Sequence, residues 1–449
     1  MKKNIDIVNK KLLPAMIVFA IPLVLSSVLQ TLYNAADSLI LGRYESSNAL
    51  GAVGSVGPMV NIFVNLFTGI STGTNIVVAR YQGAEDRQMV KKTSDTAIIT
   101  ALISGIIIGI VGFLLARPVA RLFGIDAELV DMSVLYMQIY FLGMPFVSLY
   151  NFVSATMRGI GDTKNPMISL IISGASNVVM NIIFVKNLGM GVVGVAIATI
   201  LSQLIGFIIL AVMLKKSEIG LDFRTIRFDK GLFTKMFKIG FPAGIQGITF
   251  SLSNSIIMSA VNSFGAASAA GNAVVSQVEG ISWVAINSIG LAVTTFASQY
   301  IGAGRGKELG KIMKNGLIIS LSLGIFVSAL FYTTRGFVTE MFAPGDAQVA
   351  KYAMIKYTYV ILPYFLVSIM EIPAGMLRGM GATFVSMLGS IAGVCGIRWV
   401  WLLLLFPVVK TLEFVYLCYP VSWIVTGIVF IFIYTRLKKR IDSGAVLSF

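Results

Sequence analysis

A single carboxylate stands near the end of the first apolar segment of the sequence. Asp37 is the only charged residue between positions 12 and 41. Placing a charge inside a membrane costs about 2.5–3.5 kcal/mol, so such groups are kept for ion binding, proton relay or substrate contact. Gln30, Tyr33 and Asn34 precede it at helical spacing, which puts all four on one stripe. We expect that stripe to face a cavity; a helix cap or a lipid-headgroup contact is the alternative role for Asp37.

Two later apolar segments carry amides and hydroxyls at the same spacing. Asn177 and Asn181 are four residues apart, as are Thr199 and Gln203. At 1.5 Å per residue, the two amides and Thr199 lie within roughly 15 Å of the outer ends of their segments, as Asp37 does. One pocket can therefore collect a carboxylate, amides and hydroxyls, a set that suits a proton or a hard cation. The alternative is that the amides only join helices, at about 0.6 kcal/mol each.

The second half of the chain carries charges of its own inside apolar segments. Glu279 has Ser276 three residues before it and Trp283 four residues after it, so the three share one helical stripe. Arg398 falls at a similar depth, which predicts a buried Glu279–Arg398 ion pair, structural or in contact with substrate. Lys356 also lies within an apolar segment, and we expect it to snorkel outward.

Composition assigns the chain to a class. Of its 449 residues, 56% are hydrophobic and only 12% are charged, with a mean hydropathy of +0.86, whereas soluble domains carry about 25% charged residues. The net charge of +15 is spread over short loops, as expected of a membrane protein rather than a nucleic-acid-binding one. Histidine is absent and the two cysteines lie in apolar runs, which excludes a Cys/His metal site. No nucleophile and base or paired carboxylates occur at useful spacing, so we expect no enzyme activity and no cofactor.

Twelve apolar runs are close to or above the roughly 20 residues that a membrane span needs. They lie at about residues 12–41, 49–79, 93–117, 129–157, 165–185, 190–214, 239–262, 267–299, 312–334, 350–377, 382–408 and 414–435. Most Lys and Arg residues fall in the segments on the side of the N-terminus. This asymmetry predicts that both termini are cytoplasmic, in a multi-pass protein of the cell membrane.

The two halves of the sequence repeat each other at an offset of about 220 residues. Ile21-Pro22 recurs as Phe241-Pro242, and the turn beginning at Arg158 recurs at Arg378. Six spans separate equivalent points, so the halves share one orientation, with substrate and ions expected near the interface of two rocking bundles. The prediction is an all-α polytopic protein with twelve transmembrane helices in two pseudo-symmetric six-helix bundles. Its domains are residues 1–214, a basic linker 215–238, residues 239–437 and a cytoplasmic tail 438–449.

Several motifs resemble those of the multidrug and toxic compound extrusion (MATE) family. They are Leu32-Tyr33-Asn34 followed by Asp37, the turn Met157-Arg158-Gly159-Ile160-Gly161-Asp162-Thr163 with its copy Leu377-Arg378-Gly379-Met380-Gly381, and the loop Ala79-Arg80-Tyr81-Gln82-Gly83-Ala84 with its copy Ser298-Gln299-Tyr300-Ile301-Gly302-Ala303. The resemblance spans the chain and implies an antiporter that exports amphipathic, often cationic compounds using inward Na+ or H+.

The resemblance also implies a cation site in the N-terminal half. The family's helix 1 Asp falls on Asp37, its helix 5 Asn on Asn177 and its helix 6 Thr on Thr199. Where many members carry a second carboxylate, this sequence has Asn181. We carry no family role across to Glu371, which lies nearer the cytoplasmic end of its segment.

The missing second carboxylate bears on the coupling ion. Burial disfavours an ionised Asp37, and no second negative charge stands beside it to hold Na+, so proton coupling is favoured. Tyr33 and Asn34 complete the expected coupling site, with Na+ at Asp37, Asn177, Asn181 and Thr199 as the alternative. Candidate substrate contacts are Gln30, Gln203, Glu279, Trp283 and Arg398. We expect a monomer in the lipid bilayer that exports small organic, cationic molecules by alternating access; a flippase for lipid-linked saccharides or lipids is the alternative.

Overall fold

The computed structural model describes residues 7–8, 10–217, 219–220 and 225–443, and within these ranges the chain forms helices and no strands. Helices satisfy every backbone N–H and C=O group within one segment, which a lipid environment requires. Parts of the predicted domains lie outside the described residues: positions 1–6 and 9 of the first domain, 218 and 221–224 of the linker, and 444–449 of the tail.

The first half of the chain forms seven α-helices. They are α1 (Leu12–Tyr44), α2 (Ser47–Gly83), α3 (Arg87–Leu122), α4 (Val130–Leu142), α5 (Met144–Gly159), α6 (Lys164–Asn181) and α7 (Gly191–Lys215). A π-helix, Ile182–Asn187, extends α6. α4 and α5 are bent by 49° where they join at Gly143, and Pro145, which lacks a backbone N–H, stands in the first turn of α5.

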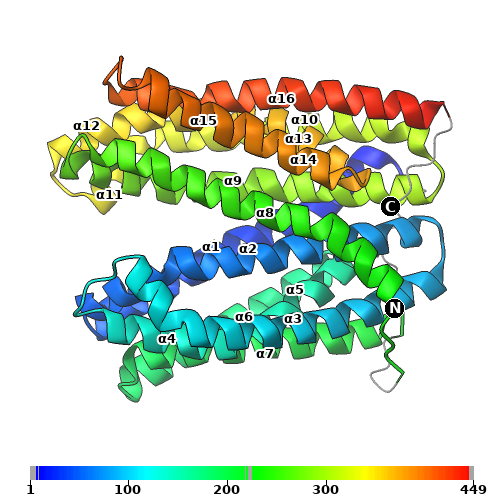
Figure 1. Cartoon of the computed structure of the whole chain (residues 1–449), viewed down its shortest axis with the longest axis horizontal. Coiled ribbons are helices and arrows are strands. Elements are labelled where there is room, and N and C mark those ends of the chain that lie inside the picture. Colours follow the sequence, from blue (N-terminus) through cyan, green and yellow to red (C-terminus); the bar gives the residue numbers. More distant parts are fainter. Residues whose placement is uncertain (1–6, 9, 218, 221–224, 444–449) are drawn as a thin grey trace. The chain divides into compact units, whose positions relative to one another are not determined.

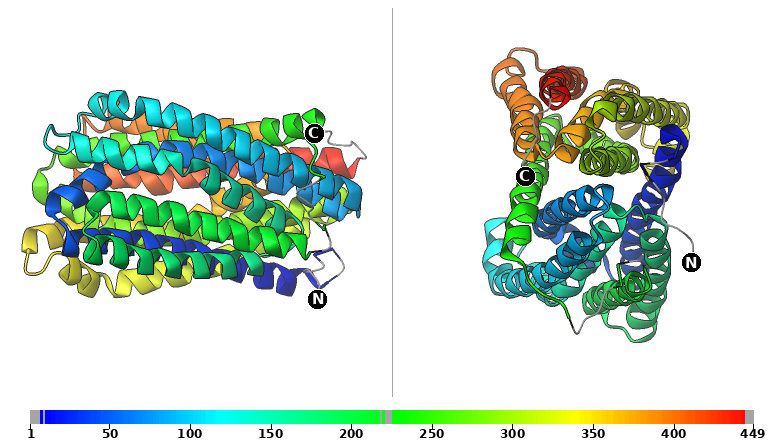
Figure 2. Two further views of the ribbon diagram at one scale, coloured as in Figure 1. Left: turned by 90° about the horizontal axis from the view of Figure 1, so that it is seen from below. Right: turned by 90° about the vertical axis from the view of Figure 1, so that its right-hand side faces the viewer.

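The second half forms α8 (Lys230–Asn262), α9 (Ala266–Gly302), α10 (Leu309–Thr333), α11 (Arg335–Phe342), α12 (Ala347–Lys356), α13 (Val367–Gly379), α14 (Thr383–Ser390), α15 (Ile397–Val400) and α16 (Leu412–Asp442). Short 3-10 or π segments at Gly306–Glu308, Tyr357–Ile361, Tyr364–Leu366, Ile391–Gly396 and Trp401–Leu405 join several of them. The long helices of either half run alongside one another in Figure 1 and are seen nearly end-on at the right of Figure 2.

Twelve helical elements in the described part of the chain match the twelve predicted spans. Ten are long and apolar enough to cross a membrane, and the bent pair α4–α5 is an eleventh. α8, with 33 residues, is not among these by length and hydropathy but lies where the seventh span is predicted. The predicted fold class, two six-helix halves of an all-α membrane protein, is confirmed.

The start of α8 differs from the prediction, because Lys230–Lys238 are helical rather than part of a linker. Asp229 explains the early start: its Oδ1 accepts a hydrogen bond from the backbone N–H of Leu232, at 2.9 Å. Such a side chain satisfies one of the unpaired donors at a helix N-terminus. The backbone N–H of Asp229 in turn donates to Thr96 Oγ1 of α3, at 3.2 Å.

The chain forms two compact units whose boundaries fall inside helices. Among the described residues, the N-terminal bundle comprises those from Leu25 to Gly244, and the C-terminal bundle comprises those up to Val24 and those from Ile245 onward. The first half of α1 therefore belongs to the C-terminal bundle and its second half to the N-terminal bundle. For α8 the assignment is the reverse. The two exchange points lie close after Pro22 and Pro242, which are equivalent in the repeat.

Within the N-terminal bundle, glycines let α2 contact the first half of α8. A Cβ atom on Gly69 would lie 2.1 Å from the Gly244 nitrogen, and one on Gly73 would lie 2.1 Å from the Met236 carbonyl oxygen. A Cβ atom added to Gly240 of α8 would likewise lie 2.5 Å from Ile70 Cα of α2. The two backbones thus meet directly, as small residues spaced four apart allow in membrane helices.

Gly73→Ala should destabilise the protein, because its new methyl group meets a carbonyl oxygen that cannot move alone; overpacking costs about 1–3 kcal/mol. The measurement is the thermal midpoint of the detergent-purified protein. Gly57→Ala on the same helix is the matched control, since a Cβ there meets no atom within 4 Å and the helix propensity gain is the same. Equal midpoints for the two variants would contradict the direct backbone contact.

Candidate functional site

An acid and two amides form a hydrogen-bonded chain between α1 and α6. Asn181 Nδ2 donates to Asp37 Oδ1 at 2.5 Å and to Asn177 Oδ1 at 3.2 Å. Asn181 is fully buried and Asn177 is nearly so, while Asp37 is partly exposed. The structure thus brings together three residues that the sequence placed at one depth on two separate helices.

One oxygen atom in this hydrogen-bonded network accepts no hydrogen bond. Asn181 Oδ1 is buried and accepts no hydrogen bond from any described residue. A buried unpaired acceptor costs about 1–3 kcal/mol, so its persistence points to a role. Asn181 is also the last residue of α6 before the π-helix Ile182–Asn187, and such π segments occur often at functional sites.

Tyr33 brings α1 close to α6 on the same stripe. A Cβ atom on Gly174 would lie 2.0 Å from Cε2 of the Tyr33 ring, so only glycine admits the ring there. The Tyr33 hydroxyl donates to the carbonyl oxygen of Ile171 at 3.4 Å. The ring and this bond hold α1 against α6 one turn before Asp37.

The remaining predicted members of the N-terminal site do not join the chain of hydrogen bonds. Thr199 Oγ1 donates to the carbonyl oxygen of Val195 in its own helix, at 2.9 Å. Asn34 and Gln30 are exposed, and Gln203 is half-buried on α7. The helical spacing of these residues was predicted correctly, but spacing does not determine which partner a hydroxyl or amide group binds.

Two tyrosines near this site were missed from the sequence. Tyr136 and Tyr140 of α4 stack with ring centroids 6.1 Å apart, and both lie within electrostatic reach of Asp37. They are four residues apart on an apolar helix, a signal that core packing gives equally well.

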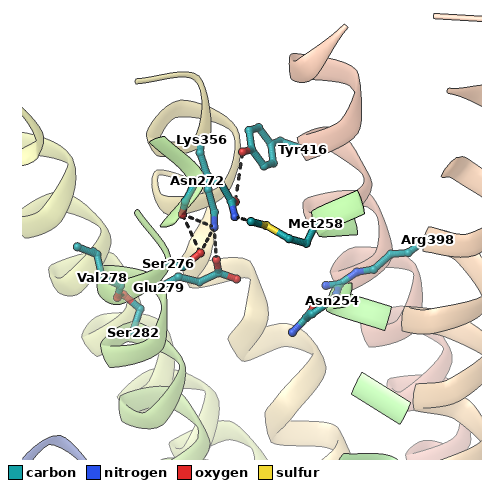
Figure 3. A network of polar contacts seen from close by, with 10 residues as sticks. All are labelled: Asn254, Met258, Asn272, Ser276, Val278, Glu279, Ser282, Lys356, Arg398 and Tyr416. Carbon is teal, nitrogen blue, oxygen red and sulfur yellow. Dashed lines mark hydrogen bonds and ion pairs between the residues drawn. The ribbon is translucent and has the colours of Figure 1, made fainter. Parts of the chain in front are cut away.

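A second polar cluster lies inside the C-terminal bundle (Figure 3). Lys356, at the end of α12, pairs with Glu279 of α9 at 2.8 Å and donates to Ser276 Oγ at 2.7 Å. Its Nζ also lies 3.5 Å from the carbonyl oxygen of Asn272. Lys356 is 1% exposed, so the expectation that it snorkels outward is wrong. An acid, a hydroxyl and a carbonyl satisfy the ammonium inside the bundle.

The predicted Glu279–Arg398 pair is also wrong, because Glu279 is engaged by Lys356. Arg398 of α15 donates through Nη1 to Asn254 Oδ1 at 3.3 Å and through Nε to Ser422 Oγ at 3.2 Å. Its guanidinium carbon lies 4.3 Å from the centroid of the Tyr419 ring. The sequence prediction rested on depth alone, and depth does not specify which helix face a charge occupies.

Trp283 and Glu371, which the sequence analysis also considered, both contact other side chains of the C-terminal bundle. Trp283 meets the ring of Phe250 edge-on, with centroids 6.4 Å apart. Glu371 forms an ion pair with Arg378, seven residues later in α13, and both side chains are buried. Asn287 Nδ2 also lies 3.4 Å from Glu371 Oε1. Glu371 is therefore neutralised within the C-terminal bundle.

Comparison with known proteins supplies the family context of these sites. The MatE family model matches residues 22–184 and 242–402. The probable multidrug resistance protein YoeA of Bacillus subtilis (strain 168) is 28% identical over 394 residues, covering 86% of this chain and 85% of that protein. The probable multidrug resistance protein NorM of Thermotoga maritima is 26% identical over 393 residues, covering 86% and 83%. A solved multidrug resistance MATE family transporter in an outward-facing conformation shares the fold, with a TM-score of 0.90 at 20% identity and 99% coverage of both chains.

Proposed function

This chain belongs to the MatE family of multi-pass membrane transporters, and from that premise we propose that it exports amphipathic, cationic organic compounds in exchange for protons. Its relatives are named for multidrug resistance, which supports a drug exporter. The flippase alternative gains no support from these relatives. The observation that carries the coupling proposal is the partly buried acid–amide pair Asp37–Asn181.

The single carboxylate of this site, Asp37, favours a proton over Na+. Asn181 presents its NH2 group, not its oxygen, to Asp37 and Asn177, whereas Na+ needs oxygen ligands from several sides. Thr199 is turned to its own helix. A site with one carboxylate offers Na+ little negative charge, whereas an amide that can present either its NH2 group or its oxygen can pair with Asp37 in both protonation states.

A rotation of the Asn181 amide by 180° would match the protonated state. Neutral Asp37 would then donate its proton to Oδ1 of Asn181, the oxygen that now lacks a donor. Protonation removes a charge from the α1–α6 contact and lets the pocket shed water. Because α1 contributes residues to both bundles, a tilt that starts at Asp37 reaches the C-terminal bundle along the same helix. Proton uptake and release of a cationic substrate are thus coupled reciprocally.

Reconstitution into liposomes tests this function. A cationic dye is loaded on the substrate side, and transport is followed under an imposed pH gradient, an imposed Na+ gradient, or neither. The proposal requires transport that follows the pH gradient in Na+-free buffer. Transport that follows only Na+ would overturn proton coupling, and transport that is absent in all three conditions would overturn cationic-compound export.

From the charge asymmetry of the loops we infer that both termini and the basic segment before α8 are cytoplasmic. A reporter fused after Phe449, a position outside the described residues, should therefore be active only inside the cell. A matched fusion in the loop between α3 and α4 should report from outside. The reverse pattern for the two fusions would overturn the proposed orientation.

A further inference from the structure

Four phenylalanine rings form a ladder along the first half of α8. Phe233, Phe237 and Phe241 are spaced four residues apart, which places them on one face of the helix, and Phe228 stands just before the helix. The ring centroids of successive members lie 5.6, 5.8 and 4.9 Å apart. Phe228, Phe237 and Phe241 are between 37% and 48% exposed. This phenylalanine ladder is therefore a continuous apolar surface that the described residues leave partly uncovered.

A different face of the same helix stretch packs inside the N-terminal bundle. Leu232, Met236 and Ile239 are buried, and α2 meets the backbone of α8 at Met236 and Gly240. Helices of this kind bury one stripe and expose the other. The phenylalanine ladder is thus not the surface that holds α8 in its bundle, and its rings are available to a partner from outside the protein.

Two exposed lysines stand beside the ladder. Lys230 lies three residues before Phe233, and Lys238 lies three residues before Phe241, so each neighbours a ladder ring on the helix surface. Both lysines are exposed, and the ion pairs among the described residues involve neither of them. A cation in the first turn opposes the helix dipole, so Lys230 does not serve the stability of α8. The two ammonium groups are suited to an external anion.

The equivalent stretch of α1 shows what an ordinary lipid-facing surface looks like in this protein. The repeat places Leu13, Ile17 and Ile21 at the three helical ladder positions. These aliphatic side chains are between 38% and 52% exposed, about as much as the rings of α8. Val18 stands at the position of Lys238. α8 therefore adds aromatic rings and a charge at positions where lipid contact alone requires only aliphatic side chains.

The length of α8 brings this surface to the depth of the lipid headgroups. Its 33 residues extend over about 50 Å at 1.5 Å per residue, whereas a bilayer with its headgroups is about 40–45 Å thick. The first turns of α8 therefore reach the headgroup layer. Side chains lean toward the N-terminus of their helix, so Lys238 can extend from the apolar region toward the phosphates. Lys230 lies about 12 Å nearer the cytoplasm.

We propose that the phenylalanine ladder, Lys230 and Lys238 bind an anionic phospholipid of the cytoplasmic leaflet. The rings contact an acyl chain, and the lysines contact the phosphate. Free phosphate offers nothing to the rings, and a zwitterionic lipid offers no net charge to the lysines. An anionic lipid is the occupant that satisfies both parts of the surface. This binding requires neither an exported substrate nor an ion gradient, so it goes beyond the proposed export function.

The affinity test compares phosphatidylglycerol with phosphatidylcholine bearing the same acyl chains. Each lipid is titrated into the detergent-purified protein, and bound copies are counted by native mass spectrometry. The wild type should bind its first phosphatidylglycerol about tenfold or more tightly than its first phosphatidylcholine. Lys230→Gln and Lys238→Gln should each weaken phosphatidylglycerol binding about fivefold and leave phosphatidylcholine binding unchanged. Lys10→Gln is the matched control, because Lys10 is the exposed α1 equivalent of Lys230 and should have no effect.

Three outcomes of this titration would overturn the proposal. One is equal affinity of the wild type for the two lipids. Another is an equal loss of affinity in Lys10→Gln and Lys230→Gln, which would show attraction by the overall positive charge rather than by this surface. The third is displacement of phosphatidylglycerol by inorganic phosphate, which would show that the rings take no part in binding.

A second measurement locates the lipid on the helix. Phe237→Trp keeps an aromatic ring in the ladder, and Ile17→Trp places the same ring at the equivalent position of α1. Both variants are reconstituted in phosphatidylcholine bilayers that contain a small fraction of brominated lipid, and quenching is measured relative to the wild type, whose four tryptophans give the baseline. Brominated phosphatidylglycerol should quench Phe237→Trp more than brominated phosphatidylcholine does, whereas the two lipids should quench Ile17→Trp equally. Equal quenching of Phe237→Trp by both lipids would refute the site.

Discussion

Asp37→Asn is expected to abolish gradient-driven export while leaving the fold intact. The amide is isosteric with the carboxyl and still accepts the hydrogen bond that Asn181 donates to Asp37, so the α1–α6 contact persists. An amide cannot take up a proton, so the site loses the change of charge that coupling requires. Dye transport by proteoliposomes under an imposed pH gradient should fall to the level of protein-free vesicles.

Asp131→Asn is the matched control, because its side chain is 83% exposed beside Arg117. That variant should transport as the wild type does. Full pH-driven transport by Asp37→Asn would refute the mechanism.

The same site predicts the effect of adding a carboxylate. Asn181→Asp would place a second acid beside Asp37, supplying oxygen ligands where the amide nitrogen now stands. Two carboxylates supply the oxygen ligands and the negative charge that a bound Na+ needs. Transport should therefore shift toward dependence on Na+, and an unchanged ion preference would remove the argument from the missing carboxylate.

Glu279→Gln is expected to have the largest effect on stability. It leaves the Lys356 ammonium, whose side chain is 2% exposed, without an anion inside the C-terminal bundle. Removing one partner of a buried pair costs about 3–5 kcal/mol. The free energy of unfolding, measured with denaturant in detergent, should fall by that order. Glu308→Gln, in a surface pair with Arg305, is the control and should cost about 0–1 kcal/mol.

The double variant Glu279→Gln with Lys356→Met separates the pair from its parts. Replacing a buried ion pair by residues of similar volume is often neutral, so the second change should restore most of the stability lost in the first. A double-mutant cycle measures this as an interaction energy. Additive losses would show that Glu279 and Lys356 are not coupled.

The fold was predictable because each of its determinants is local or repeated along the chain. Apolar length set the spans, and the repeat at Pro22 and Pro242 set the two halves. The contact between Asp37 and Asn181 was also within reach, since helical spacing and depth placed both at one level. Rotation of each helix about its own axis was not encoded in those signals. For that reason Lys356 was assigned outward and Arg398 was given the wrong partner.

The boundaries between the bundles were beyond sequence reasoning for a different reason. Hydropathy locates the ends of spans, whereas the structure divides the bundles inside α1 and α8. Nothing in the composition of a continuous 33-residue helix states that its two halves have different neighbours. Pro22 and Pro242 mark the region, but a proline indicates a bend and not a change of partner.

This exchange has a consequence for biosynthesis. The N-terminal bundle is complete once the ribosome has passed Gly244, because it spans a nearly continuous stretch of chain. The first half of α1 emerges before everything else, yet its neighbours come late: Phe19 packs on Phe296, and Met16 lies against Gly316. A newly inserted α1 must therefore keep one half unassembled in the lipid until most of the protein has been translated, and a gene cut between the two repeats would strand one half-helix on each fragment.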